Sequence, residues 1–269
     1  MAVHSALYNV IFKACQKAAR NLRRDFGEVE NLQVSKKGPL DFVLTAERQT
    51  ERLLYEELKH ARPKYGFLMK VQGTLHSSDP NRQRWIIDSL DGAKNFLHGI
   101  PHFAISVALE EKGEIIAGAI YQPLNDEFYW AEKGSGSFLN NRRLRVSSRS
   151  KIQQALLATG ISIAEITNSR NLFNVSESKL LEKSFGVLCF GSSALNLAWV
   201  ASGRLDGYWE QKLNINNTAA GILLVKEAGG YISDFKGKIA LLKSAGDLIA
   251  SNSVLHTPLV SLLNHINIS

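Results

Sequence analysis

The 269-residue chain is poor in cysteine and has no long apolar run. Its two cysteines, Cys15 and Cys189, lie far apart and form neither a metal-binding nor a redox spacing, which argues against a disulfide framework and a zinc site. We expect both to be buried. No stretch approaches about 18 consecutive apolar residues, so the sequence excludes a transmembrane helix. Repeats and a Pro/Gly/Ser-rich linker are also missing, and we therefore expect one domain over residues 1–269, with lobes of about 1–150 and 151–269.

The composition is that of a globular protein, with 45% hydrophobic residues and a formal net charge of +7. This charge favours anionic partners, which range from phosphorylated metabolites to nucleic acid. The basic run "NNRRLRVSSRSK", residues 140–151, is interpreted as a solvated hairpin, with a nucleic-acid surface as the alternative.

The N-terminal segment also allows two interpretations. Residues 1–24 carry five basic side chains and no acidic one, a composition that overlaps that of a mitochondrial presequence. Apolar residues nevertheless recur at helical spacing from Leu7 to Leu22, which predicts an ordinary first helix docked on the core. We adopt the second interpretation and expect a cytoplasmic protein that does not act at a membrane.

Local patterns predict a mixed α and β chain. Residues 45–60 read as a second helix with Thr45 as its N-cap, and a later helix is expected to start at Thr257 and Pro258. From Trp85 onward, short β-rich runs separated by turns predict an antiparallel meander. After residue 150 helices and strands alternate, with a helix at 193–201 and another from about Thr218 that closes on Gly229-Gly230 before a strand. The fold class is therefore α+β, with an antiparallel first half and an α/β second half.

The stretch "WIIDSLDGAKNF", residues 85–96, carries the strongest chemical signal. Asp88 ends an apolar strand and Asp91 follows across a turn at Gly92, so both carboxylates could meet at a Mg²⁺ ion. The amides of Gly92, Ala93 and Lys94 would then open a helix and could bind an anion. The alternative is a simple surface turn rich in aspartate.

Three segments together resemble the inositol monophosphatase family, especially its bacterial extragenic-suppressor (SuhB-like) branch. "WIIDSLDGAKNFLHGIPHF" is similar to the family signature W-x-x-D-P-[IL]-D-G-T-x-N-F-x-x-[GR]-x-P, and "GSSALNLAWVASGRLDGYWE" and "AAGILLVKEAGG" are similar to its second half. The resemblance runs from the first helix to near the C-terminus. It implies a layered αβαβα fold, usually a homodimer, that hydrolyses small phosphomonoesters with Mg²⁺ and is inhibited by lithium.

The same resemblance shows departures at the positions that should carry the chemistry. The family's Gly-Glu-Glu is replaced by Met69-Lys70-Val71, and its signature threonine, which helps to activate water, is Ala93. The partner acid of that threonine corresponds to Glu47, and the metal-binding aspartate of W-D-x-A-A-G is Asn217. The residues that do match the family's catalytic and metal-binding positions are Asp88, Asp91 and the Leu90 carbonyl. The matching substrate and phosphate set is Gly92, Ala93, Lys94, Gly191, Ser192, Ser193 and Glu210.

These replacements predict a degenerate metal site with low Mg²⁺ occupancy. A lysine ammonium has three donors and no acceptor, so Lys70 cannot ligate Mg²⁺ and would repel it. Unit charges 4 Å apart interact by about 4 kcal/mol at an effective dielectric near 20, enough to remove much of the affinity. Asn217 brings no charge, and Ala93 has no hydroxyl with which to orient water. Lys70 could instead act as an internal cation beside Asp88 and Asp91, or it could turn to solvent.

Two functions remain open at this level. The first is a family member whose Mg²⁺-dependent hydrolysis is lost or strongly weakened and whose cleft still binds a small phosphorylated or anionic ligand. The second is an active Mg²⁺-dependent inositol (or related polyol) monophosphatase that uses a reduced metal set. The sequence leaves the ligand unnamed, and it leaves open a nucleic-acid or protein partner.

Overall fold

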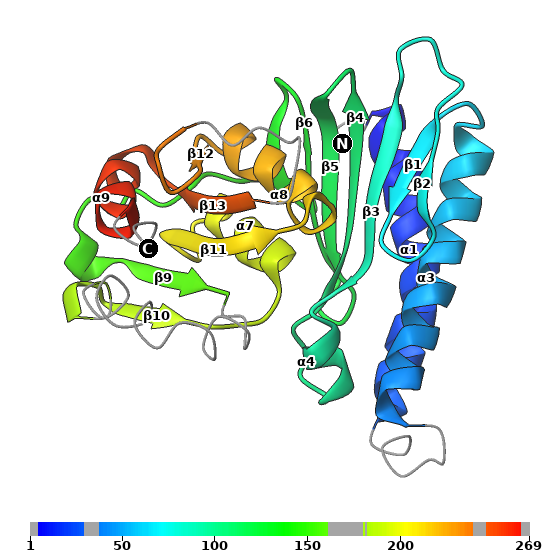
Figure 1. The fold of residues 1–269 in the computed structure, drawn as a ribbon, viewed down its shortest axis with the longest axis horizontal. Helices are drawn as coiled ribbons and strands as arrows, with labels where there is room; N and C mark the ends of the chain where they lie inside the picture. The colour runs from blue at the N-terminus through cyan, green and yellow to red at the C-terminus, as the bar shows by residue number, and fades with distance from the viewer. Residues whose placement is uncertain (1–4, 30–37, 161–179, 181, 239–245, 265–269) are drawn as a thin grey trace.

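The computed structural model describes residues 5–29, 38–160, 180, 182–238 and 246–264. Within these ranges two β-sheets alternate with helices in five layers (Figure 1). Two long helices cover the outer face of the first sheet, two helices fill the space between the sheets, and a last helix covers the outer face of the second sheet. The expected αβαβα layering is thereby confirmed.

The first sheet has eight strands in the order β2-β1-β3-β4-β5-β6-β7-β8. From β3 onward each strand pairs antiparallel with the next, which confirms the meander. β1, which precedes the predicted meander, pairs parallel with β3, so the first sheet is mixed rather than antiparallel throughout. The chain turns back through β2 and the 76–83 loop before it enters β3 beside β1 in the same direction. The strands are β1 Gly66–Met69, β2 Gly73–Leu75, β3 Arg84–Asp91, β4 Ala104–Glu111, β5 Glu114–Gln122, β6 Glu127–Glu132, β7 Gly136–Leu139 and β8 Arg142–Arg143.

Helices α1 (Ala6–Gly27) and α3 (Pro39–Ala61) pack on the outer face of this sheet. The apolar stripe of α1 is buried as predicted from its spacing. Helix α3 begins six residues before the expected N-cap, because Pro39 has the fixed φ that suits a first helical position. Thr45 therefore lies inside the helix, where its hydroxyl donates to the Asp41 carbonyl.

The second half supplies a five-stranded sheet in the order β10-β9-β11-β13-β12, with parallel pairs at β10-β9-β11 and antiparallel pairs beyond. Its strands are β9 Leu156–Thr159, β10 Gly186–Leu188, β11 Gly207–Leu213, β12 Tyr231–Ser233 and β13 Gly246–Ser251, and the short 3₁₀ helix η1 spans Ile152–Gln154.

Helices α7 (Ser193–Ala201) and α8 (Ile215–Glu227) lie between the sheets. Helix α7 has the predicted bounds, and α8 ends before Gly229, whose φ of 84° gives the left-handed stop predicted there. Helix α8 packs closely on β5, since a Cβ added at Gly118 would lie 2.9 Å from the Cα of Ala220. The first turn of α8 is held over β1 and β3 by the side-chain amide of Asn216, which donates to the carbonyls of Leu68 and Ile87.

Two smaller expectations are corrected. Helix α9 (Ser253–Leu263) starts at Asn252, whose side chain accepts from two backbone amides, so Pro258 lies inside the helix rather than at its start. Cys15 is buried as expected, whereas Cys189 is exposed. No described helix is both long and apolar enough to cross a lipid bilayer.

Candidate functional site

Asp88 and Asp91 meet at the end of β3 because the strand is irregular there. The pairing of β3 with β4 shifts register between these two residues, whereas in a regular strand side chains three positions apart would point to opposite faces. Both carboxylates are buried. The side-chain amide of Asn217, in the first turn of α8, donates to Asp88 and, at 3.0 Å, to Oδ1 of Asp91. Asn217 therefore bridges the two aspartates.

Lys70 follows β1, and although its side chain is 43% exposed, its ammonium lies beside two acids of the site. Its ammonium lies 2.8 Å from Oε1 of Glu47 in α3 and 3.9 Å from Oδ1 of Asp88. Burial lowers the pKa of Lys70, but the attraction of Asp88, Glu47 and Asp91 outweighs this effect and the net pKa is raised. Lys70 therefore keeps its charge and lies beside the acids while partly exposed to solvent, which is closer to the first of the two sequence-based interpretations.

Glu51 positions Lys70 and was missed in the sequence. Its buried carboxylate accepts hydrogen bonds from the backbone amides of Val71, at 2.9 Å, and Gln72, at 2.8 Å. Glu51 lies four residues after Glu47 in α3, so both acids face the same turn. That spacing could have identified Glu51 from the sequence. Two acids one helical turn apart share a face with Leu54 and Leu58, and a solvent-exposed helix face would not carry these leucines.

Asp91 is also connected to the second half of the chain. Its Oδ2 accepts from the Ser192 hydroxyl and, at 2.9 Å, from the backbone amide of Ala194 at the start of α7. The next residue, Ser193, donates to Oε2 of Glu210 at 3.0 Å, and the Tyr208 hydroxyl donates to the same oxygen. The consecutive residues Ser192 and Ser193 thus bind two predicted acids, Asp91 and Glu210.

The pKa values reflect how closely the acids are packed. Burial raises the pKa of Asp88, the charge of Asp91 raises it further, and it reaches about 7 although Lys70 lowers it. Burial also raises the pKa of Asp91, against the hydrogen bonds from Ser192 and Ala194. Burial and the charge of Glu210 raise the pKa of Tyr208, so its hydroxyl remains a donor.

Gly92 starts the predicted short helix, α4 (Ala93–Leu97), with a left-handed φ of 86°. A Cβ at this position would lie 2.8 Å from the His102 carbonyl oxygen, so glycine is required. Ala93 is partly exposed beside Asp91, and Lys94 is exposed. The structure therefore keeps Ala93 and its amide at the site and turns Lys94 outward.

Asn95 and Gly160 are two further residues that sequence reasoning missed. The amide of Asn95 donates to the carbonyls of His102 and Phe190, both at 2.7 Å, and so ties α4 to the segment that leads into α7. A Cβ at Gly160 would lie 2.0 Å from the carboxyl carbon of Glu210. Glycine at position 160 therefore leaves the space that Glu210 occupies.

The side chains of Asp88 and Asp91 fit a Mg²⁺ ion, whereas those of Glu47, Lys70 and Asn217 do not in this arrangement. Asp88 and Asp91 offer hard oxygen atoms, but Glu47 is paired with Lys70, and Asn217 presents its donor nitrogen rather than its oxygen. In the described part of the chain no three His, Cys, Asp or Glu side chains are grouped so as to hold one metal ion. The ammonium of Lys70 contacts Glu47 and Asp88, and the side-chain amide of Asn217 donates to Asp88 and Asp91.

Comparison with known proteins agrees with the fold. A family model described as "Inositol monophosphatase family" matches residues 3–267. A protein of Mesorhizobium japonicum named inositol-1-monophosphatase is 48% identical over 95% of each chain, and one of Rhizobium meliloti with the same name is 48% identical over 92% of each. A Nus factor SuhB of Xylella fastidiosa is 38% identical over 85% of this chain and 82% of its own. The native crystal structure of the extragenic suppressor protein suhB from Bartonella henselae superposes with a TM-score of 0.87 at 44% identity, covering 96% of this chain and 98% of the other.

Proposed function

Because the chain belongs to the inositol monophosphatase family, we propose that its site takes a small phosphomonoester of the inositol monophosphate class and hydrolyses it slowly with Mg²⁺. The relatives that are 48% identical carry the name of the enzyme, which supports hydrolysis over binding without turnover. The observation that carries the proposal is the convergence of Asp88, Asp91, Ser192 and Glu210 from both halves of the chain.

The geometry supports a reduced metal set rather than the full one. Asp88, Asp91 and the Leu90 carbonyl would hold the ion, and the ion would supply positive charge to the phosphate and activate a water molecule. Binding requires Lys70 to withdraw and the Asn217 amide to turn, both of which cost existing contacts. We therefore expect turnover far below that of an enzyme with the full carboxylate set.

The remaining residues have roles that do not depend on the metal. Ser192 and the Ala194 amide hold the Asp91 carboxylate in one orientation. Glu210, itself oriented by Ser193 and Tyr208, is placed to accept a hydrogen bond from a polyol hydroxyl. The amides of Gly92 and Ala93 would bind a phosphate oxygen.

A second candidate function, a binding module without turnover, is favoured by one specific observation. The ion pair of Lys70 with Glu47 and the two hydrogen bonds of Asn217 satisfy the carboxylates internally. Because the carboxylates have these partners, the site does not need a bound ion to be stable. A ligand could therefore bind there even if its hydrolysis is lost. Ala93, which lacks the hydroxyl that would orient water, favours the same outcome.

One experiment separates the two functions. Release of phosphate from inositol 1-phosphate would be measured over a wide range of Mg²⁺ and Mn²⁺ concentrations, beside calorimetric titration of the same compound. Saturable, metal-dependent release that Asp91→Asn abolishes supports the slow enzyme. Binding without release supports the module, and neither binding nor release would contradict both.

Partners beyond the substrate stay predictions. We expect a homodimer, and gel filtration with light scattering would test this. The relatives named Nus factor SuhB, at 38% identity or less, leave a protein or nucleic-acid partner as a further prediction for this chain. The expected cytoplasmic location is likewise a proposal.

A further inference from the structure

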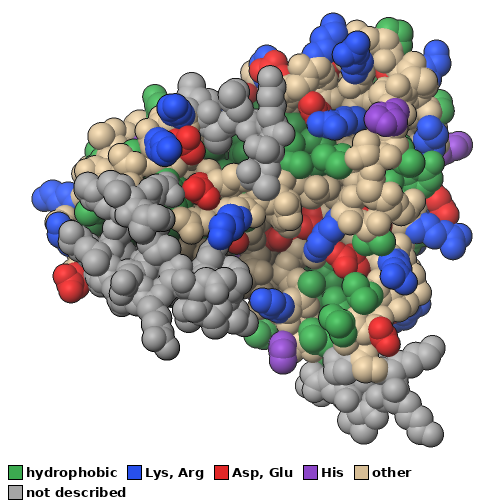
Figure 2. Space-filling view, in the orientation of Figure 1, with side chains coloured by type: hydrophobic (Ala, Val, Ile, Leu, Met, Phe, Trp, Pro, Cys, Tyr) green, Lys and Arg blue, Asp and Glu red, His purple; other side chains and the backbone are tan. Residues whose placement is uncertain are grey.

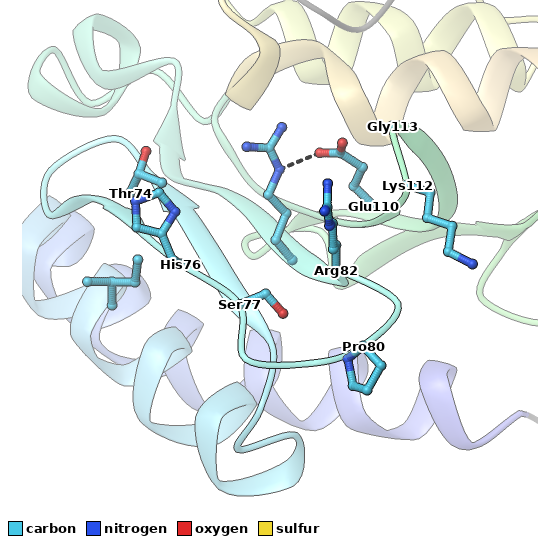
Figure 3. Close-up of a pocket in the computed structure, with 10 residues that line it drawn as sticks. Thr74, His76, Ser77, Pro80, Arg82, Glu110, Lys112 and Gly113 are labelled. Carbon is cyan, nitrogen blue, oxygen red and sulfur yellow. Dashed lines mark hydrogen bonds and ion pairs between the residues drawn. The ribbon is translucent and has the colours of Figure 1, made fainter.

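A cavity lies at the opposite end of β3 from the two aspartates. It has a volume of about 730 Å³ and is formed by the end of β2, the β2–β3 loop, the start of β3 and the β4–β5 turn (Figure 3). Arg84, at this end of β3, is four residues before Asp88, or about 13 Å along an extended strand. The cavity is therefore separate from the site described above.

Positive charge dominates this cavity. Its lining includes Arg82, Arg84 and Lys112, with His76 at its edge, against a single carboxylate, that of Glu110. Figure 2 shows Lys and Arg side chains together with histidines over this end of the molecule. Glu110 is already paired with Nε of Arg84 at 2.5 Å. The two other cations, Arg82 and Lys112, therefore have no acidic partner in the lining.

Three acids flank the lining residues in the sequence, and each has a partner other than the cations of the cavity. Asp79 accepts from the backbone amide of Asn81 within the loop, and Glu111 accepts from the side chain of Gln83. Glu114, after the turn, pairs with Lys133. Among the described residues, Arg82 and Lys112 form no ion pair. Their charges are available to a ligand.

The protein fixes the side chain of Arg84 and the backbone positions from which the exposed side chains of Arg82 and Lys112 extend. Glu110 fixes Arg84 across the β3–β4 pair, so its two terminal nitrogens can contact an anion. Arg82 and Lys112 occupy tight-turn positions with left-handed φ angles of 54° and 52°. In Figure 3, Arg82 and Lys112 extend from the two loops that border the cavity. Thr74 adds a hydroxyl donor to the lining.

We propose that this cavity, the Arg82–Lys112 groove, is a second anion-binding site that takes a small ligand with two or more linked phosphate groups. Arginine binds phosphate oxygens through paired N–H donors, whereas lysine contributes a point charge. Three cations around one cavity suit several phosphates better than one. A cavity of this volume can accommodate a small oligophosphate.

The test uses tripolyphosphate as the probe, titrated calorimetrically into the full chain at low ionic strength. The variant is Arg82→Asn with Lys112→Asn, because asparagine tolerates a left-handed φ and the turns should keep their shape. The control is Lys236→Asn with Lys238→Asn, which removes the same charge from two exposed positions on the other half of the chain. Near-identical thermal unfolding of all three proteins would show that each is folded.

We expect the groove variant to bind tripolyphosphate at least about tenfold more weakly and the control to bind within about twofold of the wild type. Equal binding by the groove variant and the wild type would overturn the proposal. A single-stranded RNA that binds through the same two residues while tripolyphosphate does not would also overturn it, and would identify a nucleic-acid surface instead. Phosphate release from inositol 1-phosphate should be the same in all three proteins.

Discussion

The ammonium of Lys70 lies 2.8 Å from a carboxylate oxygen of Glu47, and this ion pair joins the end of β1 to helix α3 across the candidate site. Glu47 was expected to help activate water. Its carboxylate is instead committed to a neighbouring cation. We expect this relationship to govern how the site responds to metals, and it motivates the first prediction.

Mg²⁺ on the order of 1 mM should leave the melting temperature of the wild type nearly unchanged, because a ligand stabilises only in proportion to its occupancy. Lys70→Glu removes the repulsive cation and adds a carboxylate, so Mg²⁺ should raise the melting temperature of this variant by several degrees. Lys236→Glu, with the same charge change at a distant exposed position, is the control. A rise of several degrees in the wild type would show that Lys70 does not exclude the ion.

Restoring the family residues should restore catalysis only in combination. Lys70→Glu with Ala93→Thr and Asn217→Asp should give Mg²⁺-dependent, lithium-sensitive release of phosphate from inositol 1-phosphate, at a rate at least about a hundredfold above the wild type. Each single change should add little, because metal, water and hydroxyl act as one unit. Equal rates for the wild type and the triple variant would contradict the degenerate site.

The pH dependence of stability should carry the signature of Asp88. Burial raises the pKa of its carboxyl from the ordinary 3.8 to about 7 in the folded chain, so folding favours the protonated form. Its contribution to stability is complete below about pH 4 and is lost as the pH rises towards 7. The free energy of unfolding of the wild type minus that of Asp88→Asn should therefore fall over this range in urea titrations without metal. A difference that is constant or rises with pH would refute the raised pKa.

Glu51 should contribute to stability through the two amides that it accepts. Glu51→Gln keeps the volume but loses the charge and one acceptor oxygen, so a buried amide is left without its partner, at a cost of about 1–3 kcal/mol in urea denaturation. Glu56→Gln, in the same helix but with a side chain 46% exposed, is the control and should cost less than about 0.5 kcal/mol. Equal losses of stability in the two variants would show that Glu51 does not help to position Lys70.

Gly160 should determine where Glu210 lies. In Gly160→Ala the new methyl group would overlap the Glu210 carboxylate, so that side chain must move, and affinity for inositol 1-phosphate should fall about tenfold with the fold retained. Gly186→Ala, where a Cβ would lie an ordinary 3.6 Å from Leu156, should have no effect. Unchanged affinity in Gly160→Ala, measured by calorimetry, would argue against a ligand role for Glu210.

Local sequence was sufficient for much of this protein. Apolar spacing predicted the face that α1 buries, and the β-rich runs after Trp85 predicted the meander. Gly92 and Gly229 marked the turn into α4 and the end of α8, because each needs a left-handed φ that few other residues adopt. The signature residues also identified Asp88, Asp91, Ser192, Ser193, Glu210 and Asn217, which the fold brings together.

Tertiary structure alone decided the rest, because the deciding contacts join residues far apart in the chain. No local pattern shows that β1 lies parallel to β3, or that the Asn217 amide turns its donor towards Asp88, 129 positions away. The sequence left Lys70 two possibilities, solvent or the aspartates. Packing places Lys70 beside the acids. Glu51 accepts from the backbone amides of the turn after β1, and Glu47 supplies the partner charge. Both acids become neighbours of Lys70 only when α3 docks on the sheet.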